Sequence, residues 1–460
     1  MSEVKKANLT NEILEASIWK LIRKFSLPAI IGMSINGINA FFDGLFVGQF
    51  VGESAVAAIS LAFPLTFITG GISAMIGVGG AALLSQAIGA GDDKMQRSIL
   101  GLCTGISIIS SILLMIFGIV FAPEMIGLLG GEGEILEQGV LYYRITLIGA
   151  FFRIHGVVLN MLIRAEGKVA LAMYMSMSAA LINIGLNFTF MGILDLGISG
   201  AAWATVTSMA ILTIMGYIYY LMGQANYEVS AFSIAFDRVV SKPLLSIGIS
   251  AAMLQLMFFV QQSIVFLLIK KYGSDWDIAF MGTCYRVMLL MVFPSFGFAI
   301  AFQPVAGINY GAKIYDRVRD SFSKFLIVAT ISMVVPWAIV MMMPQVVIGW
   351  VLPDATISAQ DIFNFRMFVA TLPLFPCFFI GTTLFQAVGK ARIAGLLTVA
   401  RDVIFFLPAA LLLPMYLGVA GIYYTGIPIN IISVSIAFVI IKKTFDEWQA
   451  MTSSGPKSIA

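Results

Sequence analysis

Residues 99–121 of this chain read ILGLCTGISIISSILLMIFGIVF, and residues 326–343 read LIVATISMVVPWAIVMMM. Neither stretch carries a charge on any face. A strand of a membrane barrel alternates in polarity over about ten residues, whereas a membrane-spanning helix needs about 20 apolar residues in succession. In lipid, only helices and closed barrels satisfy every backbone amide internally. These two stretches therefore predict an all-α integral membrane protein.

The composition of the whole chain agrees with a lipid environment. Of its 460 residues, 60% are hydrophobic and 11% are charged, and the mean hydropathy is +0.97. A soluble domain carries about 25% charged residues. The net charge of +3 leaves no electrostatic footprint for a nucleic-acid partner. Three widely separated cysteines lack CxxC spacing, so we expect packing residues rather than a disulfide or metal site: Cys103, Cys284 and Cys377.

The apolar runs and the glycine-rich breaks between them predict about twelve membrane-spanning helices. The segment before residue 16 is polar and the first run is long, which argues against a cleaved signal peptide. An even number of spans puts both termini on one side of the membrane. We place the spans at 26–50, 54–86, 95–121, 139–162, 169–193, 198–222, 243–271, 279–307, 322–343, 361–386, 393–415 and 418–441.

Basic residues are distributed unevenly over the connecting segments. One set of loops, together with both termini, holds most of the lysines and arginines. The opposite set holds only Lys270 and Lys271 and is rich in acidic residues. Cytoplasmic loops carry the excess of positive charge in membrane proteins. We therefore predict a multi-pass protein of the plasma (inner) membrane with both termini in the cytoplasm.

The chain matches itself at a constant offset. Three separated pairs share it: Gly89 with Gly311 (311 − 89 = 222), Arg144 with Arg366 (366 − 144 = 222), and Gly167 with Gly389 (389 − 167 = 222). Repeated halves around a central cavity are typical of transporters. We predict an N-terminal six-helix lobe at 1–222, a cytoplasmic linker at 223–242 and a C-terminal six-helix lobe at 243–460, related as parallel repeats.

Five motifs occur in order along the chain: Pro28 to Gly48, Gln86 to Asp92, Gly197 to Thr205, Gln303 to Ala312 and Gln386 to Lys390. In this order they resemble the multidrug and toxic-compound extrusion (MATE) family, in its bacterial drug-resistance and damage-inducible branch, over essentially the whole chain. The resemblance implies a V-shaped bundle of two lobes. It also implies an antiporter, without a cofactor, that exports small, mostly cationic organic compounds by alternating access in exchange for protons or sodium ions. We expect the chain to act as a monomer.

One carboxylate, that of Asp43, lies deep inside the first apolar run. A charge at bilayer depth is costly, so such a residue faces the protein interior or water and is a functional candidate. Asn36 and Asn39 precede it by seven and four positions, which places all three on about one helix face. The resemblance implies that Asp43 belongs to the cation-coupling site, for a proton or a sodium ion. The alternative is a structural ion pair with a buried arginine: Arg144, Arg153 or Arg286.

The fifth run departs from the family pattern. Many relatives have N-x-x-x-D where this chain has Asn183 and Asn187. These two amides lie one helical turn apart and offer neutral oxygen ligands to the same site. We therefore expect Asp43 alone to supply the titratable charge. The resemblance also implies a hinge at Pro28, which kinks a helix by removing a backbone bond; the alternative is a proline merely tolerated near a helix start.

Polar residues of the second half are candidates to line the central cavity. Gln261 occupies the place of Asn39 (261 − 39 = 222), and Gln262 follows it. With Arg286, these are our substrate-cavity candidates; the alternative for the glutamines is bonding one helix to another. For the adjacent Arg401 and Asp402 we expect a structural ion pair.

The sequence contains no Walker-type phosphate loop, GxSxG elbow or HExxH helix. We therefore expect no catalytic residues and an ion gradient as the source of energy. The only histidine, His155, is expected to be a packing residue, with a proton-pathway role as the alternative. In a central cleft, the 26 methionines and 36 phenylalanines would suit flat aromatic cations.

Two other functions stay open at this point. A flippase for lipid-linked sugars has a related architecture and would need several arginines in one shared cleft, for which Arg144, Arg153, Arg286 and Arg366 are the candidates. A channel or a non-transporting membrane protein would show no counterflow of substrate against an ion.

Overall fold

The computed structural model describes residues 10–129, 131–351 and 357–453, and within them every regular element is a helix. A short helix at 10–15 precedes the first long one. The first half contains α2 (Ile18–Phe50), α3 (Glu53–Ala90), α4 (Asp93–Val120), α5 (Ala122–Leu128), α6 (Gly133–Ile148), α7 (Ala150–Ala165), α8 (Val169–Asn187), the π-helix η1 (Phe188–Ile193) and α9 (Gly197–Leu221). The second half contains α10 (Arg238–Tyr272), α11 (Asp275–Gly311), α12 (Tyr315–Met342), α13 (Pro344–Val351), α14 (Ala359–Val369), the 3₁₀ helix η2 (Leu372–Leu374), α15 (Phe375–Ala387), α16 (Ala391–Val399), the π-helix η3 (Ala400–Phe405), α17 (Phe406–Leu417), α18 (Val419–Tyr424) and α19 (Gly426–Ser453).

The predicted set of spans is confirmed. Among the described residues, ten helical stretches are long and apolar enough to cross a membrane, and α6 with α7, bent by 52°, makes an eleventh. The 33-residue α2, some of whose side chains are not described, is a further long helix, at the position of the first predicted span. The helix α10 begins at Arg238, inside the segment predicted as a linker at 223–242. The exact lobe boundaries stay a prediction.

Helix ends coincide with the polar and glycine-rich breaks in the sequence. At the start of α4, the side chain of Asp92 accepts a bond from the backbone N of Met95 at 3.0 Å, which satisfies a free helix N–H. Gly167 follows α7 with φ +85°, and its repeat partner Gly389 follows α15 with φ +76°. Residues with a side chain rarely adopt such angles, so glycine suits both helix ends.

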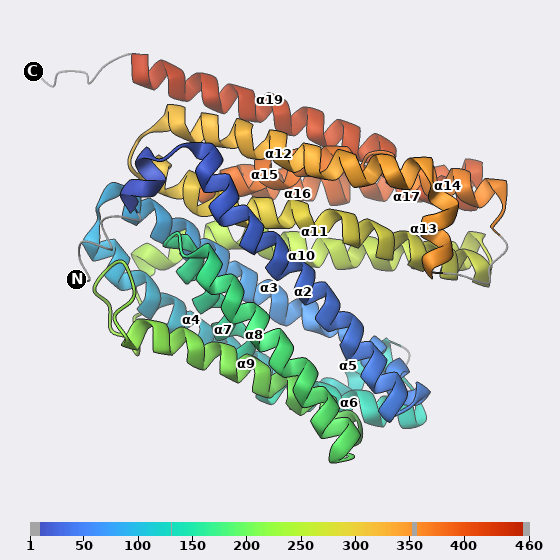
Figure 1. Ribbon diagram of the computed structural model, residues 1–460. Helices are drawn as coiled ribbons and strands as arrows, with labels where there is room; N and C mark the ends of the chain where they lie inside the picture. The colour runs from blue at the N-terminus through green and yellow to red at the C-terminus, as the bar shows by residue number, and fades with distance from the viewer. Residues whose placement is uncertain (1–9, 130, 352–356, 454–460) are drawn as a thin grey trace, which may run out of the picture.

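The two halves are structural repeats down to single hydrogen bonds. Arg144 Nε donates to the carbonyl of Ile119 at 3.2 Å, and Arg366 Nε donates to the carbonyl of Met341, also at 3.2 Å. Both members of each bond are related by the same offset (366 − 144 = 222 and 341 − 119 = 222). The two bundles converge at the end that carries the marked termini and splay apart toward α5, α6, α13 and α14, as a V (Figure 1).

Glycines allow the two lobes to approach closely at the converging end. A Cβ atom on Gly89 of α3 would lie 1.9 Å from the carbonyl oxygen of Ile308, and one on Gly311 of α11 would lie 2.0 Å from that of Gln86. These contacts are again repeats of each other (308 − 86 = 222). Gln86 Nε2 also donates across the lobes to the carbonyl of Ala387 at 2.7 Å. Small residues allow such close approach of helices in membranes.

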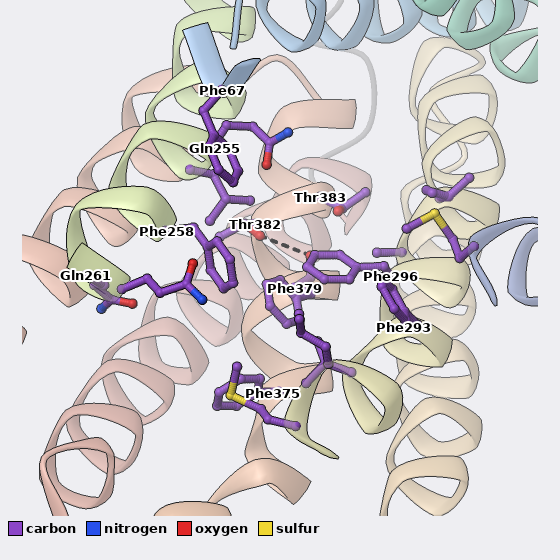
Figure 2. A pocket seen from close by; sticks show the side chains of 18 of the residues that line it. Phe67, Gln255, Phe258, Gln261, Phe293, Phe296, Phe375, Phe379, Thr382 and Thr383 are labelled. Atoms are coloured by element: carbon purple, nitrogen blue, oxygen red, sulfur yellow. Dashed lines mark hydrogen bonds between the residues drawn. The ribbon is translucent and has the colours of Figure 1, made fainter. Parts of the chain in front are cut away.

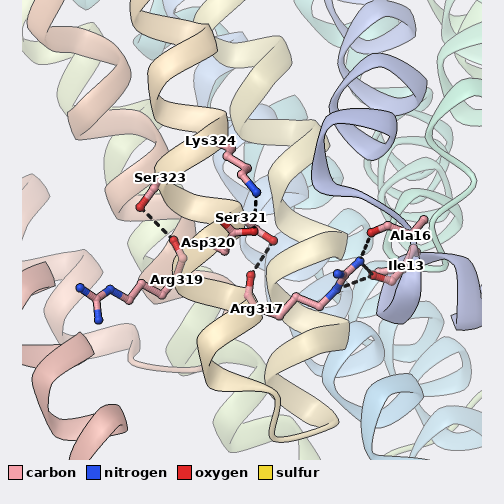
Figure 3. Close-up of polar contacts among 8 residues, drawn as sticks. All are labelled: Ile13, Ala16, Arg317, Arg319, Asp320, Ser321, Ser323 and Lys324. Carbon is pink, nitrogen blue, oxygen red and sulfur yellow. Dashed lines mark hydrogen bonds and ion pairs between the residues drawn. The ribbon is translucent and has the colours of Figure 1, made fainter.

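The segment before α2 ties the two lobes together at the same end. Arg317, on α12 of the second half, donates to the carbonyls of Ile13 and Ala16, and its Nη2 lies 2.9 Å from the Ile13 oxygen (Figure 3). These carbonyls end the short helix at 10–15 and have no helical partner of their own. The guanidinium therefore caps this segment and anchors it to the opposite lobe.

Candidate functional site

A cavity of about 660 Å³ lies between the two lobes and is lined by both of them. Its wall is mostly aromatic and aliphatic, with many methionines. Rings from α10, α11 and α15 gather around it (Figure 2), and the ring centroids of Phe296 and Phe379 lie 4.4 Å apart. Amide side chains interrupt this apolar wall from both lobes: Asn39, Asn160, Asn183, Gln255, Gln261, Gln262, Gln303, Gln386 and Asn430.

The structure places Asp43 at the centre of a chain of amide donors. Asn187 Nδ2 donates to one carboxylate oxygen at 2.5 Å, and Asn39 Nδ2 donates to the other at 3.3 Å. The Asn187 amide is also 3.1 Å from Asn183 Oδ1, and Asn183 Nδ2 donates to Ser208 Oγ at 3.3 Å. Three helices, α2, α8 and α9, therefore converge on one carboxylate. The side chain of Asn36 lies outside the described residues.

Neutral groups, not a guanidinium, hold this carboxylate. Among the described residues, the structure records no ion pair between Asp43 and any arginine or lysine. Arg144 is exposed and binds the Ile119 carbonyl instead. Asn39 Oδ1 is buried without a recorded partner beside the acid. Asn39 and Asn183 line the cavity, whereas Asp43 is not among its lining residues, so these amides stand between the acid and the cavity.

Pro28 lies inside α2, ten residues after the helix begins at Ile18 (28 − 18 = 10). The alternative of a proline tolerated near a helix start is therefore wrong, because the first helix extends further than its apolar run. At this depth proline removes one intrahelical hydrogen bond.

In the second lobe, the predicted ion pair of Arg401 and Asp402 is confirmed. Arg401 Nη1 lies 3.1 Å from Asp402 Oδ1, with side-chain exposures of 14% and 2%. Gln261 Nε2 donates to the same carboxylate oxygen at 2.8 Å, and Arg401 Nη2 donates to Asn430 Oδ1 at 3.3 Å. The guanidinium also lies over the Phe378 ring, 4.8 Å from its centroid. Gln261 thus combines both predicted roles, since it lines the cavity and bonds one helix to another.

Arg286 is not where the sequence placed it. It is exposed and does not line the cavity, so its selection as a cavity candidate is corrected. The reason is helix phase: α11 presents Tyr285, Met288 and Leu289 to the cavity, and the next residue after Tyr285 is rotated about 100° away. Gln262 does line the cavity. So does Arg164, which lies just beyond the span predicted at 139–162.

His155 is fully buried in the first lobe. Its ring stacks on Phe151 with centroids 5.2 Å apart, and Tyr217 lies 5.4 Å away on another side. Neither ring nitrogen has a recorded partner, and the residue does not line the cavity. It packs as expected, without the hydrogen bond that a buried imidazole usually makes.

A bundle of about a dozen apolar helices in two repeated lobes around a shared cavity defines a membrane transporter rather than an enzyme. The MatE family model matches residues 28–189 and 247–411, so the chain belongs to the MatE family. It is similar to the multidrug export protein MepA of Staphylococcus haemolyticus, at 23% identity over 411 residues, which covers 89% of this chain and 90% of the relative. MepA of Staphylococcus aureus matches at 23% identity over 415 residues, with the same coverage.

Solved structures share the fold. A MATE protein in the bent conformation superposes with a TM-score of 0.90 at 22% identity, over 96% of this chain and 99% of the other. The outward-facing conformation of a multidrug resistance MATE family transporter of the MOP superfamily gives a TM-score of 0.88 at 23% identity, over 95% and 98% of the two chains. At such identities the likeness concerns the fold alone.

Proposed function

We propose that this protein is an antiporter that exports small, mostly cationic organic compounds by alternating access, driven by protons or sodium ions. The observation that carries the proposal is the environment of Asp43. Its carboxylate is held by the amides of Asn39 and Asn187, with no recorded cationic partner, directly behind the cavity wall. An acid left uncompensated at membrane depth suits reversible binding of a small cation. The relatives are multidrug export proteins, which supports the same function for this chain.

The amide chain suits either coupling ion. Amide N–H groups stabilise the ionised carboxylate by charge-assisted hydrogen bonds, so the site holds its charge while the ion is absent. A proton binds the carboxylate itself. A sodium ion prefers several oxygen ligands, as hard cations do, and Asn39 Oδ1, buried without a recorded partner beside the acid, is such an oxygen. Asn183 supplies a second amide oxygen one turn from Asn187.

The cavity wall suits the substrate class. Phenylalanine rings attract organic cations by cation–π contacts, and methionines adapt to irregular shapes. The V opens away from the terminal residues (Figure 1). If the termini are cytoplasmic, as the distribution of basic residues predicts, this conformation faces outward. The cavity is complete within one chain, which supports a monomer.

The flippase alternative is disfavoured by the same cavity. It calls for several arginines in a shared cleft, but Arg144, Arg153, Arg286 and Arg366 do not line it. Of the arginines in the described part of the chain, Arg164 and Arg401 do line it, and Arg401 is paired with Asp402.

The proposal is tested in inverted vesicles. Uptake of a fluorescent organic cation is measured under a proton gradient and then under a sodium gradient, for the wild type and for Asp43→Asn. We expect one of the two gradients to drive uptake. In the variant the rate of uptake should fall by at least about tenfold, because the amide can neither bind a proton nor supply charge to a sodium ion. Glu137→Gln, which neutralises an exposed carboxylate on α6, is the control and should transport normally. Full gradient-driven uptake by Asp43→Asn would exclude this acid as the coupling site. Absence of counterflow in the wild type would favour a channel.

A further inference from the structure

The segment that joins the two lobes carries a short row of exposed apolar side chains. Phe232, Ile234 and Phe236 are 64%, 58% and 65% exposed, whereas the residues between them are half-buried. Such alternation at every second residue means that one side of the segment faces the protein and the other faces outward. We call residues 232–236, which form no regular helix or strand, the linker strip.

The inward side of the linker strip packs on two glycines of α4, Gly101 and Gly105. The backbone N of Ala235 donates to the carbonyl oxygen of Gly101 at 2.9 Å. A Cβ atom on Gly105 would lie 2.8 Å from the carbonyl oxygen of Ala235. One on Gly101 would lie 3.0 Å from Ser233 Oγ. The missing side chains therefore leave room for the backbone of the strip to lie directly on the helix, as small residues do where helices pack closely in membranes.

The linker strip continues the outward-facing apolar surface of α4. Ile112 and Ile116 on this helix are about half exposed, and in a membrane-spanning helix such side chains face lipid. Gly105 and Gly101 precede Ile112 by seven and eleven positions (112 − 105 = 7 and 112 − 101 = 11), which places them on the same helix face. None of residues 98–108 is exposed. The apolar side chains of the strip thus stand where the glycines of α4 offer none.

A ring contact also joins the strip to α9. The rings of Phe232 and Tyr217 stack, with centroids 5.1 Å apart and an interplanar angle of 25°. Tyr217 lies among exposed apolar residues of the same helix, Ile214, Ile218 and Leu221. The strip is therefore attached to the outward faces of two helices of the first lobe, before α10 begins the second.

The strip lies at the edge of the apolar zone rather than at its centre. Four residues before it, Glu228 pairs with Arg97 of α4 at 2.8 Å, and both side chains are exposed. The charge-free run of α4 begins at Ile99, and Gly105 lies six residues further (105 − 99 = 6), or about 9 Å at 1.5 Å per residue. Irregular backbone facing lipid does not occur in the hydrocarbon core. Amphipathic segments instead lie in the interface, with their apolar side buried about 5–10 Å.

We propose that the linker strip is a membrane anchor, whose side chains Phe232, Ile234 and Phe236 insert among the phospholipid acyl chains of the leaflet nearest the termini. Lipid is the occupant rather than a protein partner, because the row extends a lipid-facing surface and ends where exposed charges begin. The segment predicted as a cytoplasmic linker is then partly embedded. The first lobe carries it as a fixed part whenever the two lobes move relative to each other.

Spin labels on single cysteines measure the depth of the strip. The full-length chain, with its three native cysteines replaced by alanine, is reconstituted into vesicles of phosphatidylethanolamine and phosphatidylglycerol. Power saturation then gives the ratio of collisions with oxygen, which concentrates in lipid, to collisions with a water-soluble nickel chelate. For labels at Ile234 and Phe236 we expect ratios about threefold or more above that of a label at Ser230, because an interfacial anchor lies about 5–10 Å deep. Ser230, exposed two residues before the strip, is the aqueous control, and Ile112 is the lipid-facing control.

Photolabelling tests the same inference on the unaltered protein. A phospholipid with a diazirine in its acyl chain is added to the vesicles and irradiated, and the modified peptides are identified by mass spectrometry. We expect adducts on residues 232–236 and on residues 109–117 of α4, but not on 224–230. Adducts on α4 without any on the strip, or equal collision ratios at Ile234 and Ser230, would overturn the inference. The row would then be a water-exposed surface suited to a protein partner.

Discussion

At the scale of single residues, Asp43 is an acid inside a membrane-spanning helix whose recorded hydrogen-bond partners are neutral amides. Its two oxygens accept from Asn187 at 2.5 Å and from Asn39 at 3.3 Å. At the position where the resemblance implies a second carboxylate, this chain has Asn187, whose amide N–H donates a hydrogen bond to Asp43. Asn187 therefore makes the shorter of the two hydrogen bonds to the carboxylate that we propose as the coupling site.

Replacing Asn187 by leucine tests this support. Asn187→Leu keeps the shape and removes the donor, and a hydrogen bond to a charged group contributes about 1.5–3 kcal/mol. We expect gradient-driven export to fall about tenfold or more. Vesicle uptake under the driving gradient is the measurement. Gln345→Leu, at an exposed amide, serves as the control; uptake by Asn187→Leu at the control level would show that the amide is dispensable.

At this scale the sequence predicted the polar cluster around Asp43 but not the position of Arg164 in the cavity wall. Asn39 and Asp43 are four residues apart on one helix, and Asn183 and Asn187 on another, so spacing alone placed each pair on one face. Which face of an apolar helix meets the cavity depends on tertiary packing. Arg286 was therefore chosen wrongly, and Arg164, just beyond the span predicted at 139–162, was not chosen.

At the scale of helices, glycines let α3 of the first lobe pack closely against α11 of the second. Gly89 and Gly311 meet the carbonyls of Ile308 and Gln86 at distances that leave no space for a side chain. A methyl group at either position must push the two helices apart.

Gly89→Ala should therefore open the converging end. Spin labels at the exposed Lys94 and Lys313, just beyond the ends of α3 and α11, report the separation by pulsed electron resonance. We expect the distance distribution to shift to longer values, since the built Cβ lies 1.9 Å from the Ile308 oxygen. Gly185→Ala is the control, because no atom lies within 4 Å of its Cβ. Identical distributions for Gly89→Ala and the wild type would refute the steric account.

The twelve spans were predictable because apolar length is a strong signal. The interruptions within them were not. The bend of 52° between α6 and α7 and the π-helices η1 and η3 lie inside apolar runs. η1 is as apolar as the helix before it, and η3 contains the charged pair Arg401 and Asp402, but neither composition predicts a π-helix.

At the scale of the whole molecule, Glu166 links stability to pH. It lies between α7 and α8, outside the spans, and is buried. Burial raises the pKa of this carboxyl from 4.5 to about 6, although Lys168 and the Tyr219 hydroxyl act in the opposite direction. The folded state therefore binds a proton more readily than the unfolded state between these values.

The expected consequence is a protein that gains stability on acidification. The contribution of Glu166 to the free energy of unfolding is complete below pH 4.5 and is lost as the pH rises through about 6. At 1.36 kcal/mol per pKa unit this is about 2 kcal/mol. Thermal unfolding of the purified protein at pH 5 and 7.5 measures it. Glu166→Gln should reduce the pH dependence relative to the exposed-site control Glu137→Gln; identical pH profiles would contradict the assignment.

The repeat was predictable from three pairs of residues, and the structure extends it to the bonds of Arg144 and Arg366. The lining of the cavity was predictable only in part: Gln261 and Gln262 line it as expected, but most of the lining joins segments far apart in the sequence, such as Asn39 and Gln261 (261 − 39 = 222). The sequence shows that two lobes exist. It does not show which side chains meet between them.

The two halves share a helical scaffold, but the carboxylate of Asp43 has no counterpart at the equivalent position of the second half. Asp43 corresponds to Val265 (265 − 43 = 222), which lines the cavity four residues after Gln261. The substitution Val265→Asp would give the second half a carboxylate at the position equivalent to Asp43, one helical turn from the amide of Gln261. The stoichiometry of such a carrier would reveal whether one ancestral domain once worked symmetrically with its copy.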